Sequence, residues 1–278
     1  MLAEEKGAVL RVIPVDDNGD LILDEFEKLL GPKTKIVAVT HVSNAIGTIN
    51  PVKEICRKAR SISAVTLVDG AQAAAHMKID VQDIGCDFYV FSAHKMYGPT
   101  GLGILYGRKE ILDQTPPFLT GGDMIEQVSF NKSTFAKPPH RFEAGTPPIS
   151  QVVGFGASID FLDGIGMDAI ELHEKTLLDY AVALISKIEG VKILGNPKDR
   201  GALVSFDIQD IHPHDVASIL DSKAIAVRAG HHCAQPALER FGVNATTRAS
   251  FSFYNTLEEV ELLTQGLMDL IQLFGERG

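Results

Sequence analysis

The sequence predicts an α/β fold in which a mostly parallel sheet is followed by a smaller α+β region. Short apolar runs alternate with helical segments in the first half of the chain, which is typical of βαβ units. From residue 149 the pattern changes to two long helical segments followed by strand-like runs. We therefore expect a sheet domain over residues 1–148, and helices with a small α+β domain over residues 149–278.

The alternation begins with KIVAVTH (35–41), a run rich in Val and Ile that is typical of a buried strand. Pro51 suits the first turn of a helix over residues 51–61. Four apolar side chains fall on one face of that helix: Val52, Ile55, Cys56 and Ala59. Three further strands are expected in AVTLVDG (64–70), DFYVFSAHK (87–95) and GLGILYG (101–107).

The second half has a different order of elements. Long amphipathic helices are predicted over residues 149–166 and 167–190. Shorter strands and helices follow: ALVSFDI (202–208), PHDVASILDSK (213–223), AIAVRAG (224–230), ATTRASFSFY (245–254) and LEEVELLTQGLMDLIQLF (257–274). This order is typical of a small α+β domain.

Composition narrows the class of protein. Of the 278 residues, 45% are hydrophobic and 22% charged, as in most soluble globular proteins. The formal net charge of -10 argues against nucleic acid or an anionic membrane as a partner. Cys56, Cys86 and Cys233 are too few for a disulfide framework, and the first two fit core positions. Neither a signal-peptide core nor a membrane-spanning run is recognisable, so we expect a cytoplasmic protein.

Lys95 lies at the carboxyl end of a predicted apolar strand, beside Ser92 and His94. It is either a solvated lysine that caps the strand or a nucleophile in a pocket. A desolvated lysine has a lowered pKa and suits a Schiff base with an aldehyde cofactor. Ser92 and His94 would then hydrogen-bond an anion such as a phosphate.

Asp69 ends the preceding predicted strand. Aspartate is common in turns, but beside a lysine that forms a Schiff base it would have a specific chemical role. Pyridoxal phosphate needs an acidic partner that keeps its ring nitrogen protonated, so that the ring acts as an electron sink. Gln72 and Asn44, which also follow predicted strands, would contact the phenolic oxygen of that cofactor.

A glycine-containing loop carries Cys233 directly after Arg228, His231 and His232. Cations near a cysteine favour its thiolate, so Cys233 is a candidate nucleophile. A zinc site in this loop is a weak alternative, because adjacent side chains rarely converge on one metal and no second ligand pair is present. Arg248 would either hold a carboxylate or form a structural ion pair.

Five motifs together resemble the cysteine desulfurases of the class V aminotransferase family: DGAQ (69–72), SAHKMYGPTGLGILYG (92–107), RFEAGTP (141–147), RAGHHCAQP (228–236) and TRASFSFYNT (247–256). The similarity is greatest to the SufS type, which includes selenocysteine lyase-like members. The resemblance implies a pyridoxal-phosphate-dependent transferase fold of type I, like that of aspartate aminotransferase. It also implies a homodimer, with a sulfur acceptor of the SufE or SufU kind.

The same resemblance implies a role for each matched residue. Lys95 would bind pyridoxal 5'-phosphate covalently, and Cys233 would take sulfur from L-cysteine as a persulfide for iron–sulfur cluster assembly. The cofactor would be held by Asn44, Asp69, Gln72, Ser92, His94 and by Thr146 of the partner in a dimer. The substrate carboxylate would be bound by Arg248 with Arg228.

Members of the family begin with a long N-terminal portion that this chain lacks. The resemblance assigns to that portion a histidine that stacks on the cofactor and part of the phosphate site. We expect the shortened sheet to expose an apolar edge. Two alternatives to cysteine desulfuration follow: selenocysteine lyase activity at the same site, or an inactive dimerising scaffold.

Overall fold

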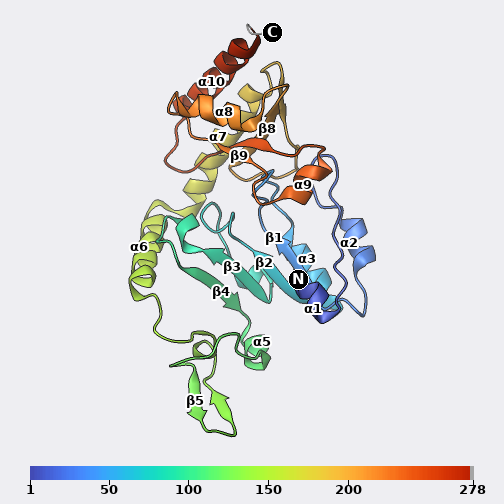
Figure 1. Ribbon diagram of the computed structural model, residues 1–278, viewed down its shortest axis with the longest axis vertical. Coiled ribbons are helices and arrows are strands. Elements are labelled where there is room, and N and C mark those ends of the chain that lie inside the picture. Colours follow the sequence, from blue (N-terminus) through green and yellow to red (C-terminus); the bar gives the residue numbers. More distant parts are fainter. Residues whose placement is uncertain (276–278) are drawn as a thin grey trace.

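The computed structural model describes residues 1–275, in which two four-stranded sheets lie one beyond the other along the long axis of the molecule (Figure 1). The predicted region 149–278 therefore extends three residues beyond the described part of the chain. None of the helices in residues 1–275 combines the length and apolar character needed to span a lipid bilayer.

The first sheet has the strand order β1-β2-β3-β4. The first three strands are parallel and β4 is antiparallel to β3, so the expected mostly parallel sheet is confirmed. β1 forms one edge, where Ile36 is 66% exposed, as expected for an apolar edge. The strands are β1 (Ile36–Thr40), β2 (Val65–Asp69), β3 (Phe88–Ser92) and β4 (Gly103–Gly107).

The helix α3 (Val52–Ser61) connects β1 to β2 and packs on the sheet. Its buried residues are Val52, Ile55, Cys56 and Ala59, the four that its sequence places on one face. Short helices surround this sheet: α1 (Leu2–Lys6), α2 (Leu23–Leu29), α4 (Val81–Ile84) and α5 (Lys109–Gln114). The α4 helix begins at Asp80, whose carboxylate accepts the backbone N–H groups of Gln82 and Asp83.

Between the two halves the chain forms a hairpin that sequence reasoning missed. The hairpin of β5 (Ile125–Val128) and β6 (Ser133–Phe135) projects from the body of the molecule in Figure 1. Its tip carries Phe130, which is fully exposed. The short helix η2 (His140–Phe142) follows it and leads toward α6 (Ile149–Ile165).

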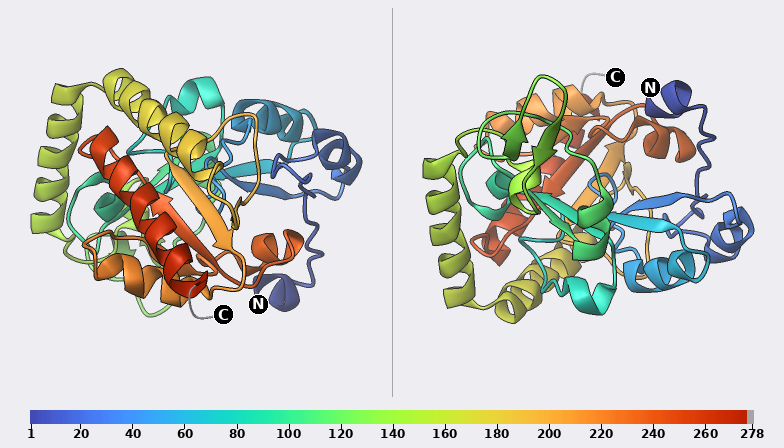
Figure 2. Two further views of the ribbon diagram at one scale, coloured as in Figure 1. Left: turned by 90° about the horizontal axis from the view of Figure 1, so that it is seen from above. Right: turned by 90° about the horizontal axis from the view of Figure 1, so that it is seen from below.

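The second sheet is antiparallel throughout, with the order β7-β8-β10-β9. Figure 2 shows α7 and α10 side by side over this sheet, and both contribute to the same apolar core. The elements are α7 (Met167–Ile185), β7 (Val191–Ile193), β8 (Leu203–Ile208), α8 (Pro213–Asp221), β9 (Arg228–Gly230), α9 (Gln235–Arg240), β10 (Thr246–Ser250) and α10 (Leu257–Gly275).

Several predicted elements are longer in the sequence reading than in the structure, three of them as follows. The strand expected over residues 87–95 ends at Ser92, and the strand over 224–230 is confined to β9. The helix over 167–190 ends at Ile185. The first strand and the helix are shorter at their ends, whereas the strand over 224–230 is shorter at its start.

Candidate active site

The polar residues that follow β1, β2 and β3 lie at one edge of the first sheet. Thr40 is paired with Asp69, and Asp69 with Val90, so the carboxyl ends of β1, β2 and β3 are level. Backbone hydrogen bonds continue this alignment, from His41 N to Asp69 O (2.7 Å) and from Gly70 N to Val90 O (2.8 Å). Ligands of parallel sheets bind beyond such strand ends.

Asp69 lies at this edge of the sheet, and its two carboxylate oxygens differ in their hydrogen bonding. Its Oδ1 accepts the backbone N–H of Ala71 at 2.8 Å, which fixes the orientation of the side chain. Its other oxygen accepts no hydrogen bond from any residue in 1–275. A protonated ring nitrogen would meet an oriented carboxylate acceptor here.

Lys95 lies on the short helix η1 (Ala93–Met96), which follows Ser92 at the end of β3. His94 and Lys95 are both exposed, and neither side chain has a hydrogen bond or ion pair to a described residue. Of the two environments that the sequence left open for Lys95, the described residues show the exposed one, with an accessible amine, although α6 packs against η1.

Cys233 is exposed in the loop between β9 and α9. His232 and Cys233 have left-handed φ values of 54° and 57°, an uncommon backbone for non-glycine residues. The backbone N–H of Cys233 donates to His231 Nδ1 at 3.2 Å. Arg228 Nη2 lies 3.7 Å from Cys233 Sγ, so one guanidinium charge faces the sulfur directly.

His232 does not act as a cation beside Cys233, which corrects the prediction from the sequence. The ring is 2% exposed and its Nε2 lies 2.9 Å from Thr246 Oγ1. Burial, reinforced by the charge of Arg248, lowers the pKa of His232 to about 4. The ring is therefore neutral at pH 7, and its buried Nδ1 has no hydrogen-bond partner among the described residues.

The cysteine loop is joined to the end of β1 by hydrogen bonds from Asn44. Its side-chain amide donates to the backbone carbonyl of His232. Arg248 Nη1 donates to the backbone carbonyl of Asn44 at 2.8 Å. Ser205 of β8 donates to the backbone carbonyl of Ala45 in the same way. These bonds bring Asn44, Cys233 and Arg248 together from segments far apart in the sequence.

Arg248 makes no ion pair with any residue in 1–275, so the structural ion pair considered from the sequence is not what holds it. Its Nε is buried and without a partner. Burial, with the nearby charge of Arg228, lowers its pKa from the usual value of arginine. A guanidinium N–H group without a hydrogen-bond acceptor is suited to bind a carboxylate.

Two predicted site residues, Gln72 and Thr146, are not joined to Asn44, Cys233 or Arg248 by these hydrogen bonds. Gln72 borders a cavity of about 400 Å³ beside α7, together with His76, Glu174 and Arg200, and no other predicted site residue lines it. Thr146 is exposed between η2 and α6 and has no hydrogen bond to the other candidates. Both assignments remain predictions.

Sequence reasoning missed the buried carboxylate of Glu174, which is 2% exposed. The signal was available, because Glu174 falls between Ile170 and Leu177 on the apolar face of α7. A carboxylate at such a position is rarely buried unless it is paired.

Comparison with known proteins identifies the family. A model of the aminotransferase class-V family matches residues 1–263. A protein of Halalkalibacterium halodurans named probable cysteine desulfurase is 52% identical over 274 residues, which are 99% of this chain and 67% of the relative. The chain thus spans about two thirds of the length of this relative.

Two solved structures have the same fold. The apo structure of a cysteine desulfurase from Thermococcus onnurineus is 43% identical, with a TM-score of 0.93 over 98% of this chain and 68% of that one. The cysteine desulfurase CsdA of Escherichia coli, in an S-sulfonic acid form, is 36% identical, with a TM-score of 0.94 and the same coverage. The chain therefore belongs to the aminotransferase class-V family, among its pyridoxal-phosphate-dependent cysteine desulfurases.

Proposed function

We propose that this site removes sulfur from L-cysteine, leaving L-alanine and a persulfide on Cys233. The observation that carries the proposal is the attachment of the Cys233 loop to the end of β1 through Asn44. This attachment brings an exposed thiol to the sheet edge that carries Asp69 and Lys95.

The residues present fit pyridoxal phosphate. Asp69 has one carboxylate oxygen that no described residue occupies, and Lys95 has an accessible amine. Ser92 and His94 would hold the phosphate, with Thr146 of a partner, while Asn44 and Gln72 would contact the ring substituent. When bound, the group supplies an electron sink for bond breaking at the substrate's α- and β-carbons.

The chain's own residues would bind the substrate and accept its sulfur. The Nε–H of the Arg248 guanidinium, which has no hydrogen-bond partner among the described residues, would bind the substrate carboxylate together with Arg228. The Cys233 thiolate, stabilised by Arg228, would attack the substrate sulfur. The carbon–sulfur bond of cysteine breaks and a carbon–hydrogen bond replaces it, while a sulfur–sulfur bond forms on Cys233. Carbon is reduced and sulfur is oxidised, so no outside oxidant is needed.

The wider role follows from the same proposal. We infer a cytoplasmic homodimer that passes its persulfide sulfur to an acceptor of the SufE or SufU kind for iron–sulfur cluster assembly. The selenocysteine lyase alternative uses the same residues, and a non-catalytic scaffold would keep the dimer without the cofactor. Turnover of L-cysteine and of L-selenocysteine, together with a measurement of cofactor binding, distinguishes these three functions.

The test measures the visible absorbance of the purified chain with pyridoxal phosphate, and alanine release from L-cysteine and L-selenocysteine. We expect a yellow band that Lys95→Ala abolishes, and a Cys233 persulfide detectable by mass spectrometry. Cys233→Ala should lose persulfide and alanine release from cysteine, while Cys56→Ser, a matched buried control, should retain both. A band without turnover of either substrate would support the scaffold, and undiminished cysteine turnover by Cys233→Ala would refute the persulfide route.

A further inference from the structure

Glu174, in the middle of α7, holds three separate segments together through its buried carboxylate. Its Oε2 lies 2.8 Å from His76 Nδ1. Its Oε1 accepts a hydrogen bond from Ser252 Oγ at 3.4 Å. The Ser252 hydroxyl is also hydrogen-bonded to the hydroxyl of Tyr97. Tyr97, Ser252, Glu174 and His76 thus form one connected chain, which we call the Glu174 network.

Each attached segment carries a residue of the proposed site. Tyr97 ends η1, two positions after Lys95, with a left-handed φ of 60°. His76 ends the turn that starts at Gly70, where Ala73 N and Ala74 N donate to Gly70 O and His76 N donates to Ala73 O, each at 2.9 Å. Ser252 follows β10, the strand that carries Arg248.

Packing alone does not account for a carboxylate at this position. Glu174 stands between Ile170 and Leu177, which are both fully buried, so an apolar side chain would suit the site. Burying a carboxylate costs free energy that only its hydrogen-bond partners recover. The direct partners, His76 and Ser252, come from the turn after Asp69 and from the segment after β10, and Ser252 links the carboxylate to Tyr97 beside η1. The network therefore joins segments next to Asp69, Lys95 and Arg248, which points to a role in fixing their arrangement.

We propose that Glu174 is a positioning residue that holds the Lys95 turn, the Gly70–Met77 turn and the strand of Arg248 in one fixed arrangement. The inference rests on the proposed function for the roles of Lys95 and Arg248. It assigns no chemistry to Glu174 itself, which acts through Tyr97, Ser252 and His76.

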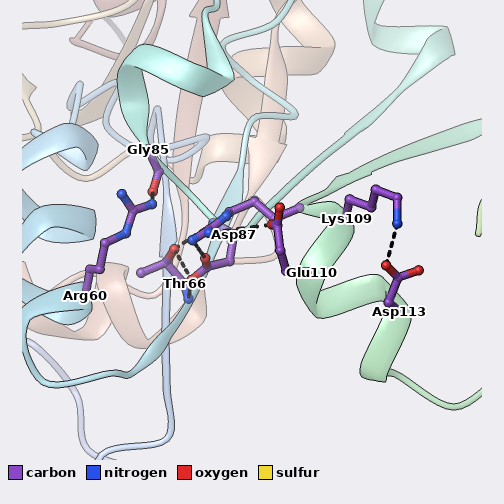
Figure 3. A network of polar contacts seen from close by, with 8 residues as sticks. Arg60, Thr66, Gly85, Asp87, Lys109, Glu110 and Asp113 are labelled. Carbon is purple, nitrogen blue, oxygen red and sulfur yellow. Dashed lines mark hydrogen bonds and ion pairs between the residues drawn. The ribbon is translucent and has the colours of Figure 1, made fainter.

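The experiment compares Glu174→Gln with a matched control, Asp87→Asn. Asp87 is also a buried carboxylate, 5% exposed, but it lies at the start of β3, away from the strand ends. Asp87 accepts hydrogen bonds from Thr66, which Figure 3 shows, and from Arg108. Both variants keep the size of the side chain and remove one buried charge.

Hydrogen–deuterium exchange of the full chain without cofactor is the first readout. Because Glu174→Gln weakens charge-assisted hydrogen bonds, we expect about tenfold faster exchange in residues 93–98 and in 70–77. Asp87→Asn should leave these two segments unchanged. Tyr97→Phe, which removes one hydroxyl, should loosen residues 93–98 alone, and it keeps the test available if Glu174→Gln does not fold.

The second readout is borohydride trapping of pyridoxal phosphate on Lys95, followed by peptide mass spectrometry. Glu174→Gln should lower the trapped fraction at least threefold at limiting cofactor, and Asp87→Asn should not. Absence of label on Lys95 in the wild-type chain would count against the proposed function, while the exchange result would still decide the inference. Unchanged exchange in both turns of Glu174→Gln, or equal loosening in Asp87→Asn, would overturn the inference.

Discussion

At the scale of single residues, the surroundings of Cys233 distinguish it from the other two cysteines. Arg228 Nη2 lies 3.7 Å from its sulfur, and the thiol is exposed. Cys56 and Cys86 are buried, and burial raises the pKa of both, that of Cys86 to about 11. Among these three cysteines, the accessible sulfur with a guanidinium beside it is therefore that of Cys233, in the loop after β9.

Alkylation of the native chain tests this difference. We expect iodoacetamide at pH 7 to label Cys233 and to leave Cys56 and Cys86 unlabelled, as measured by peptide mass spectrometry. Replacing Arg228 by Met removes the charge near the sulfur, so labelling should slow by about threefold to tenfold. Arg240→Met, which removes an exposed arginine paired with Asp17, is the control and should not slow it.

Two buried histidines make stability depend on pH. Burial lowers the pKa of His41 and of His232 to about 4, from about 6.5 in the unfolded chain. Between these values the unfolded chain binds protons that the folded chain does not. Stability should therefore fall as pH drops from about 6.5 to about 4, by on the order of 3 kcal/mol per histidine.

Urea unfolding at a series of pH values measures this loss. His232→Gln should flatten the decline between pH 6.5 and pH 4.5, because the group that takes up the proton is gone. His140→Gln, which replaces an exposed histidine, should follow the wild-type curve. An equal decline in wild type and His232→Gln would show that His232 does not contribute to the dependence.

The sequence located the candidate residues but not their charge states or partners. Asp69, Ser92 and Lys95 could be placed at strand ends from local pattern alone. The neutral state of His232 could not, because it depends on burial against Thr246. The bond from Asn44 to His232 joins residues 188 positions apart, and no local pattern contains such a contact.

At the scale of elements, the agreement between sequence and structure is greatest where one face is strictly apolar. The buried face of α3 was readable because its apolar side chains recur at helical spacing. The hairpin of β5 and β6 was missed because IEQV and STF are short, polar and mostly exposed. Their pairing is visible only in three dimensions.

Substitutions in α3 test whether the apolar face predicted from its sequence stabilises the fold. Ile55 is 0% exposed and belongs to the core between α3 and the first sheet. Ile55→Ala should lower the free energy of unfolding by about 3 kcal/mol, because it removes buried methyl groups and leaves a cavity. Arg57→Ala, on the exposed face, should change it by less than about 0.5 kcal/mol. Urea denaturation followed by circular dichroism measures both.

At the scale of the whole molecule, hydrogen bonds between distant segments and a shared apolar cluster join the two halves. Ser205 reaches the carbonyl of Ala45 across 160 positions, and Arg248 reaches that of Asn44 across 204. The sequence indicated two regions on either side of residue 149, but it gave no sign that these bonds would place the cysteine loop against the first sheet.

The surface combines exposed apolar side chains with a net negative charge. Val9, Val153 and Phe161 are 82%, 70% and 56% exposed. The formal net charge is -10 at pH 7, and the isoelectric point is about 5.4. Like charges keep molecules apart at neutral pH, and this repulsion disappears near the isoelectric point.

We therefore expect static light scattering to rise several-fold between pH 7.5 and pH 5.4, while circular dichroism shows that the chain remains folded. The double variant Val153→Ser and Phe161→Ser keeps the charge but removes two apolar contacts on α6, so it should scatter less at pH 5.4. The single variant Thr176→Ser, on the exposed face of α7, should scatter like wild type. Equal scattering by the double variant and wild type at pH 5.4 would show that α6 is not the surface through which the molecules associate.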